Sequence, residues 1–321
     1  MFLIVNINPA IDRIYTIDNF SIDKIHRTSN VLFQAGGKGI NVARANKVLK
    51  GEALLTGICG GHSSGFISED LKHAGILNDF SISDFESRTC LIIIDKVNNT
   101  QTVINEDGPP LSDSCINSFI DKFKNLVKDK NLVVISGSLP KSLSRNIYNE
   151  LVLIAKENNT KTIIDTSKKA LNEVLKIKPF MIKPNIYEFS EIFNDDNISS
   201  EALNENFKPL VVAADKLIDA GIENIVVSLG DLGAIFINKD KIFRVEAPNI
   251  KAINAIASGD AMTAAIALEL SKNKIIEEAV ISGVAAGSAN ATVGGLRFSY
   301  DLFLQLRCSI KSFYLERNEL N

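Results

Sequence analysis

A run of small residues at positions 254–265, NAIASGDAMTAA, contains the most evident chemistry in the chain. The turn at Ser258 and Gly259 leads directly into an alanine-rich helix, and the first N–H groups of a helix lack intrahelical acceptors. Those groups and the helix dipole favour an anion, so a transferring phosphoryl group can be bound there. Asp260, in the first turn, is placed to take the proton of an attacking hydroxyl. An ordinary helix N-cap gives the same pattern, so this segment alone leaves both interpretations open.

A second glycine-rich turn, AGGKGIN at positions 35–41, also precedes a helix. The adjacent glycines Gly36 and Gly37 let the backbone approach a ligand closely. Lys38 adds a cation and Asn41 an amide, which suits a polyhydroxylated or phosphorylated molecule. The turn is not a Walker A loop, because the pattern GxxxxGK[ST] is absent from the chain. A solvated lysine on an ordinary strand-to-helix turn is the alternative.

Three further side chains are candidates for holding a sugar phosphate. Asp12 follows the first expected strand, at the carboxyl edge where open α/β sheets bind ligands, and its carboxylate can accept sugar hydroxyls. Arg27 and Arg88 are suited to a phosphate through charge-assisted hydrogen bonds. Most surface arginines are merely solvated, so neither arginine is decisive alone.

Two segments are candidates for a nucleotide site. The segment 182–188, IKPNIYE, ends a strand and opens a helix, so Asn185 and Glu188 lie on one helix face. Glu188 is suited to position Mg²⁺ through waters, although Asn-x-x-Glu is also an ordinary capping box. The segment 227–233, VSLGDLG, joins two strands by a glycine turn that either cradles a nucleotide or is only a hairpin.

Composition argues against several other functions. The net charge of −3, without a run of like charges, gives no electrostatic footprint for nucleic acid. Neither a bilayer-spanning stretch nor a signal peptide is evident, so we expect a cytoplasmic protein with no membrane partner. The three histidines and four cysteines have neither Ser/His/Asp nor zinc-ligand spacing. No GxGxxG follows the first strand, which argues against a nicotinamide-dependent Rossmann enzyme.

Short apolar runs alternate with helical patterns along most of the chain. This alternation predicts a doubly wound α/β fold, with a mostly parallel central sheet flanked by helices. The expected strands are 2–7, 53–59, 132–135, 162–164, 180–182 and 225–228. The expected helices are 39–49, 112–127, 145–156 and 168–175, and the chain is mainly helical from Gly259 onward.

Two stretches, 11–33 and 88–105, break this alternation, because each contains successive strand patterns without a helix between them. They predict either a small separate β-sheet lid or extra edge strands of the main sheet. With a lid, the core comprises residues 1–7, 35–87 and 106–321, and the lid comprises residues 8–34 and 88–105. The apolar run 89–94 would then expose a strand edge, so we expect a homodimer that pairs through the lid.

Several short motifs follow one another along the chain: NPAID, GGKGIN, INEDGP, SGSLP, DTS, IKPNxxE, SLGxxG and the turn ASGD. In this order and spacing they resemble the phosphofructokinase B, or ribokinase-like, family from residue 1 to about residue 295. NPAID and INEDGP are most similar to the kinases of ketohexose phosphates, the 1-phosphofructokinases and tagatose-6-phosphate kinases. The resemblance implies a ribokinase-like core, a β-sheet lid that often pairs in a dimer, and ATP and Mg²⁺ as cofactors.

The resemblance also implies roles for individual residues. Asp260 would be the general base, beside an anion hole lined by Ala257, Ser258 and Gly259. The sugar phosphate would contact Asp12, Arg27, Gly36, Gly37, Lys38, Asn41, Arg88 and Ser136. ATP would contact Lys183, Asn185, Ser228, Gly230 and Gly233, together with Ser258 and Gly259, and Glu188 would organise Mg²⁺.

Two positions depart from the family pattern, which usually has threonine where this chain has Ala255 and glycine where it has Ala257. Alanine adopts positive φ less readily than glycine, at a cost of about 1–2 kcal/mol where that conformation is required. The backbone N–H groups survive the change, so we expect a working kinase that is slowed rather than inactive.

The expected reaction is ATP-dependent phosphorylation of fructose 1-phosphate to fructose 1,6-bisphosphate. Tagatose 6-phosphate and fructose 6-phosphate are the alternative acceptors. A non-catalytic sensor of sugar phosphate or nucleotide is the alternative from another class of function.

Overall fold

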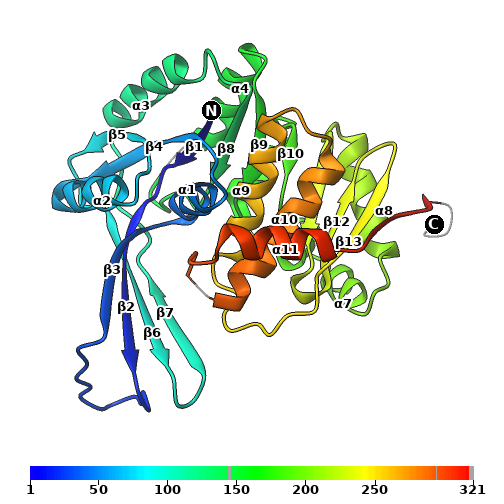
Figure 1. Cartoon of the computed structure of the whole chain (residues 1–321). Coiled ribbons are helices and arrows are strands. Elements are labelled where there is room, and N and C mark those ends of the chain that lie inside the picture. Colours follow the sequence, from blue (N-terminus) through cyan, green and yellow to red (C-terminus); the bar gives the residue numbers. More distant parts are fainter. Residues whose placement is uncertain (144–145, 294, 318–321) are drawn as a thin grey trace.

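The computed structural model describes residues 1–143, 146–293 and 295–317, and it contains two sheets (Figure 1). The main sheet has ten strands in the order β14-β13-β12-β11-β10-β9-β8-β1-β4-β5. A second sheet of four strands, in the order β3-β2-β6-β7, projects from the main body. The prediction of an α/β fold with a mostly parallel sheet is confirmed.

The strands from β11 to β5 in the sheet order pair in parallel. They are β1 (Phe2–Asn6), β4 (Ala53–Gly60), β5 (Asn78–Ser83), β8 (Leu132–Ser136), β9 (Lys161–Asp165), β10 (Met181–Ile182) and β11 (Asn224–Ser228). β1 and β8 at the centre are wholly buried, as expected for a parallel sheet that is covered on both faces.

Three strands of the main sheet were not expected from the sequence. They are β5, which extends one edge of the sheet, and β13 (Ile242–Glu246) and β14 (Ser312–Leu315), which extend the other in antiparallel pairing. β12 (Gly233–Ile237) is the second of the two strands that the segment 227–233 was expected to join, and it pairs with β11 in antiparallel fashion. β14 also interrupts the helical C-terminal third. β13 and β14 do not follow the strand–helix alternation on which the prediction rested, whereas β5 follows a helix and pairs with β4 in parallel.

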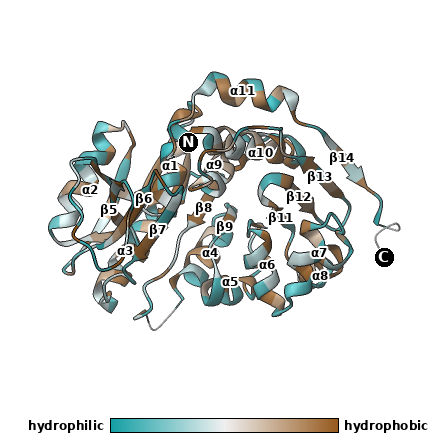
Figure 2. Ribbon diagram, turned by 90° about the horizontal axis from the view of Figure 1, so that it is seen from below, coloured by the Kyte–Doolittle hydropathy of each residue, from teal (hydrophilic) through white to brown (hydrophobic). Residues whose placement is uncertain are grey.

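Helices cover both faces of the main sheet, and Figure 2 shows them as separate layers. One apolar core lies under α1 (Lys38–Val48), α2 (Gly61–His73), α9 (Ser258–Ser271) and α10 (Ile276–Val293), with α11 (Tyr300–Ser309) packed on α10. The other lies under α3 (Asp113–Leu126), α4 (Ile147–Glu157), α5 (Lys168–Leu175), α6 (Ile186–Phe193), α7 (Asp196–Leu203) and α8 (Lys208–Asp219). The four predicted helices are all present. The predicted helix 145–156 begins at Ile147 in the structure, and position 145 lies outside the described residues.

The projecting sheet consists of β2 (Ala10–Ile17), β3 (Val31–Gly36), β6 (Arg88–Asp95) and β7 (Thr100–Asn105). β2 pairs with β3 in antiparallel and with β6 in parallel fashion, and β7 pairs with β6. None of these strands belongs to the main sheet, so the alternative of extra edge strands is wrong. We call this four-stranded sheet the lid. The exact division of the chain into core and lid residues stays a prediction.

The helix α9 begins from a conformation that non-glycine residues rarely adopt. Its N-cap, Ala257, has φ 59° and ψ 8°, in the left-handed region that favours glycine. Asn290 holds this turn, because its Nδ2 donates to the Ile256 carbonyl at 2.7 Å and to Ser258 Oγ at 3.1 Å. Ala257 therefore adopts the positive φ at which alanine is less stable than glycine.

Replacing Ala257 by glycine should raise the free energy of unfolding by about 0.5–1 kcal/mol, because relief of the positive φ outweighs the larger entropy of the unfolded glycine chain. Urea denaturation measures this change. Ala264→Gly, in the buried interior of the same helix, is the matched control and should lower stability by about 1 kcal/mol or more. Equal losses in both variants would contradict the presence of strain at Ala257.

Candidate active site

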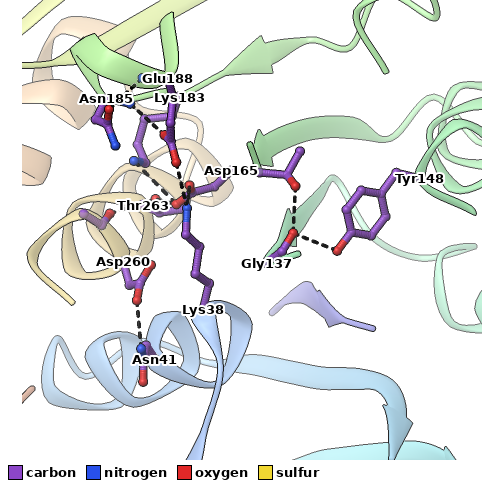
Figure 3. A network of polar contacts seen from close by, with 12 residues as sticks. Lys38, Asn41, Gly137, Tyr148, Asp165, Lys183, Asn185, Glu188, Asp260 and Thr263 are labelled. Carbon is purple, nitrogen blue, oxygen red and sulfur yellow. Dashed lines mark hydrogen bonds and ion pairs between the residues drawn. The ribbon is translucent and has the colours of Figure 1, made fainter. Parts of the chain in front are cut away.

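Strand ends and helix beginnings from distant parts of the sequence meet at one edge of the main sheet (Figure 3). Asp165 is the last residue of β9, and Lys183 directly follows β10. Asp260 lies in the first turn of α9, and Lys38 is the first residue of α1. Open α/β sheets bind ligands at this carboxyl edge, so the fold itself gathers these charged groups.

Asp165 is the centre of a buried ion network. Lys38 Nζ lies 3.3 Å from Asp165 Oδ1 and 3.3 Å from Glu188 Oε1, and Lys183 Nζ lies 3.4 Å from Asp165 Oδ2. Thr263 Oγ1 donates to Asp165 Oδ2 at 2.6 Å. Burial alone would raise the pKa of Asp165, but the charges of Lys183 and Lys38 outweigh it and hold that pKa below its usual range. Asp165 is therefore an ionised partner of both lysines.

Asp260 is buried beside this network and has a different environment. Its Oδ2 accepts a hydrogen bond from Asn41 Nδ2 at 2.8 Å, and within the described residues it forms no salt bridge. Burial and the charge of Asp165 raise the pKa of Asp260 to about 6, although Lys38 and the Asn41 amide oppose this rise. A carboxylate with such a pKa is suited to accept a proton near neutral pH.

The backbone at the start of α9 offers donors to an anion. Ser258 N–H donates to the Ala255 carbonyl at 3.1 Å, whereas the Gly259 and Asp260 N–H groups have no protein acceptor in the described part of the chain. A Cβ at Gly259 would lie 3.8 Å from Lys183 Nζ, so a buried cation stands next to these amides. The predicted anion hole is therefore open and electropositive.

Asp12 and Gly36 lie in close contact at the base of the lid. A Cβ at Gly36 would come within 2.2 Å of the Asp12 carboxyl group, so any other residue at this position would displace that carboxyl. Burial raises the pKa of Asp12 to about 6, against the opposing charge of Arg88. Arg88 donates from Nε to the Asn8 carbonyl at 3.3 Å and from Nη1 to the Glu106 carbonyl at 3.1 Å. The structure thus brings Asp12, Gly36 and Arg88 to one place.

Two other residues predicted for the sugar side lie at the same edge of the main sheet. Gly37 is the N-cap of α1, with a positive φ of 112° that disfavours other residues. Ser136 ends β8 in register with Asp165, and its buried Oγ has no partner among the described residues. An unpaired buried hydroxyl at a strand end is available to a ligand.

The predicted nucleotide segments lie side by side. Asn185 and Glu188 form a reciprocal capping box at α6, with the Glu188 N–H donating to Asn185 Oδ1 at 2.8 Å. Ser228 N–H donates to the Pro184 carbonyl at 3.1 Å, which joins the two segments. Gly230 and Gly233 have φ values of 65° and 102° in the turn that follows, so both need the freedom of glycine.

Arg27 was predicted to contact the sugar phosphate, but the structure does not place it beside the other predicted site residues. It lies exposed in the connection between β2 and β3, where it lines a cavity of about 400 Å³ formed by lid residues. Conversely, Asp165 and Thr263 were not among the predicted site residues. Asp165 directly follows the apolar strand 162–164 expected from the sequence and ends β9 in the structure, and this position at a strand end was the signal that could have identified it. Asp12, by contrast, lies within the lid strand β2 rather than at the end of β1.

The described residues contain no group of three or more His, Cys, Asp or Glu side chains placed to hold a metal ion. No helix among them is both long and apolar enough to cross a membrane.

Comparisons with known proteins agree with this geometry. Residues 3–301 match the pfkB family carbohydrate kinases. The chain is 35% identical to a 1-phosphofructokinase from Borreliella burgdorferi over 92% of this chain and 93% of that protein. It is also 35% identical to a tagatose-6-phosphate kinase from Staphylococcus epidermidis, over 91% and 92% respectively. The potassium complex of phosphofructokinase-2 from Escherichia coli superposes with a TM-score of 0.88 at 26% identity, over 96% of this chain and 98% of that one. The chain belongs to the pfkB family of carbohydrate kinases.

Proposed function

We propose that this kinase transfers the γ-phosphoryl group of ATP to a hydroxyl of a ketohexose phosphate, with fructose 1-phosphate as the first choice. The observation that carries the proposal is the pairing of Asp260, a proton acceptor with a pKa near 6, with open N–H groups at the start of α9. A phosphoryl group held by those amides lies next to the base that activates the attacking hydroxyl.

Each charged group has a distinct task in the proposed transfer. The sugar hydroxyl oxygen forms the bond to the γ-phosphorus as the bond to the leaving ADP oxygen breaks, and the hydroxyl proton passes to Asp260. Asn41 orients the Asp260 carboxylate through its hydrogen bond. Lys38 and Lys183 carry positive charge beside the developing anion. Asp165 keeps both ammonium groups in place, so little rearrangement is needed during the reaction.

In this proposal ATP binds along the segments 183–188 and 228–233, which adjoin through the Ser228 N–H and the Pro184 carbonyl, and Glu188 organises Mg²⁺. Glu188 Oε2 accepts from the Asn185 N–H and Oε1 contacts Lys38, and the described residues contain no cluster of three or more side chains that could hold a metal ion. That donor set fits Mg²⁺ held by the nucleotide phosphates and water rather than by a protein cage. When bound with ATP, the metal would offset phosphate charge.

The residues proposed to bind the sugar phosphate would decide which ketohexose phosphate is the substrate. Asp12 is placed to accept sugar hydroxyls, and Arg88 and Lys38 are suited to the substrate phosphate. The two curated relatives share the same identity with this chain, so identity does not separate fructose 1-phosphate from tagatose 6-phosphate. Fructose 6-phosphate is a third acceptor. The cytoplasmic location expected from the sequence stays a prediction.

A coupled assay of ADP release with fructose 1-phosphate, tagatose 6-phosphate and fructose 6-phosphate tests the proposal. We expect turnover with at least one, highest with fructose 1-phosphate, and Asp260→Asn should lower kcat by about 10²–10⁴-fold while ligand binding persists. Turnover with unphosphorylated fructose alone would reject the phosphate-binding assignment. Equal and negligible turnover in both proteins would instead favour a sensor, an alternative motivated by the strained turn at Ala257.

The raised pKa of Asp260 predicts a pH dependence. Asp260 acts as a base only when ionised, so kcat should be at its plateau above the pKa of about 6 and fall as pH decreases through it. Because the pKa of Asp12 is also about 6, kcat/KM for the sugar phosphate should fall more steeply than kcat. Initial rates between pH 5 and pH 8 measure both curves. A kcat that stays constant down to pH 5, as the ordinary aspartate pKa of about 3.9 would give, would contradict the assignment.

The homodimer through the lid remains our proposal, with a revised reason. The run 89–94 lies in β6, between β2 and β7, so it is not an edge as supposed from the sequence. Exposed apolar side chains of the lid strands include Phe33 and Ile104, which share one cross-strand row with Arg13 and Leu91 and therefore lie on one face of the lid. A second copy that covers this face would bury their apolar surface.

Light scattering at micromolar concentration should give the mass of a dimer for the wild type and of a monomer for Ile104→Lys, because a charge would be buried in the interface. Leu77→Lys is the matched control, since Leu77 is equally exposed but lies outside the lid. A monomeric wild type would refute the proposal.

A further inference from the structure

Arg44 and Asp70 bind the backbone carbonyl and N–H of Ala35, at a place outside the candidate active site. Ala35, near the end of β3, donates its N–H to Asp70 Oδ2 of α2 at 2.9 Å. Its carbonyl accepts a hydrogen bond from Arg44 Nη2 of α1 at 3.4 Å. The same Arg44 nitrogen forms an ion pair with Asp70 Oδ2, which closes the ring. Both side chains are largely buried, with 17% and 25% of their surface exposed.

This ring lies where the lid joins the core. β3 is an edge strand of the lid, so outward-facing backbone groups there would otherwise face water. Ala35 is followed directly by Gly36 and Gly37, and then by α1. The Gly36 backbone passes so close to Asp12 that a Cβ there would lie 2.2 Å from its carboxyl group, so a shift of Ala35 would alter the space around that carboxyl.

We propose that Arg44 and Asp70 act as a clamp that positions the turn formed by Ala35, Gly36 and Gly37 for the sugar phosphate. This inference rests on the proposed function, because that function places the sugar phosphate at Gly36, Gly37 and Asp12. Arg44 and Asp70 are positioning residues, since they act through the backbone of Ala35 rather than through contact with the substrate.

Arg44 has a second, electrostatic effect on Asp12. The groups that influence the Asp12 carboxyl are Arg88 and Cys90 of β6, Arg44 of α1 and Gln34 of β3. The positive charge of Arg44 lowers the pKa of Asp12 against the larger effect of burial. Loss of Arg44 should therefore raise that pKa further, whereas loss of Asp70 leaves the Arg44 charge in place. The two halves of the clamp thus differ in their predicted pH dependence.

Kinetics of Arg44→Met, Arg44→Lys and Asp70→Ala test the positioning role. We expect the KM for the sugar phosphate to rise about tenfold in each variant, while the KM for ATP changes less than about twofold. In Arg44→Met alone, the acid limb of kcat/KM should move to higher pH. Arg44→Lys keeps the charge and should restore the limb but not the KM. Asp79→Ala is the matched control, because it breaks the 2.6 Å ion pair with Lys122 elsewhere on the core.

Hydrogen exchange supplies a readout that does not depend on activity. The Ala35 amide should exchange about tenfold faster in Asp70→Ala than in the wild type, and at the wild-type rate in Asp79→Ala. Unchanged exchange at Ala35, or an unchanged KM for the sugar phosphate in folded Arg44→Met, would overturn the clamp. If the wild type phosphorylates no ketohexose phosphate, the proposed function fails by itself, and the exchange rates still decide whether Ala35 is clamped.

Discussion

The candidate active site depends on the ion pairs that Asp165 forms with Lys38 and Lys183. Taking charges out of water costs several kcal/mol per ion, so Asp165 and Lys183, both 3% exposed, are tolerated because each has an opposite charge close by. Lys38 extends the network to Glu188. With both lysines engaged by Asp165, Asp260 has only the Asn41 amide as a direct partner among the described residues. The pKa values of Asp165 and Asp260 are therefore shifted in opposite directions, because the two carboxylates have different partners.

The fold brings these groups together through parallel strand ends and helix beginnings. Each parallel strand ends at the same edge of the sheet, which places Ser136 and Asp165 side by side in register. The helices α1 and α9 begin at this edge, so their unpaired amides and dipoles add positive potential where the lysines lie. The lid contributes Asp12 from β2 and Arg88 from β6. The predicted site residues therefore come from two sheets that share no strand.

Sequence reasoning found the residues whose neighbours form a recognisable turn. Asp260, Asn41 and the glycines at 36 and 37 were predicted because small residues before a helix have a direct chemical interpretation. Asp165 was missed because its significance comes from Lys38 and Lys183, which are distant in sequence and meet it only in the folded chain. The strands β13 and β14 were missed because antiparallel additions to a parallel sheet leave no alternation with helices. The lid was predicted as one of two arrangements, since strand patterns do not specify which sheet a strand joins.

The central claim is that Asp260, and not Asp165, is the carboxyl group that exchanges a proton near neutral pH. Nuclear magnetic resonance of the protein with carboxyl-labelled aspartate measures this directly, with Asp260→Asn used to assign the signal. The account predicts an inflection near pH 6 for Asp260, while Asp165 stays ionised across that range. An Asp260 signal that titrates near the ordinary value of about 3.9, or an inflection near pH 6 that survives in Asp260→Asn and belongs to Asp165, would contradict it.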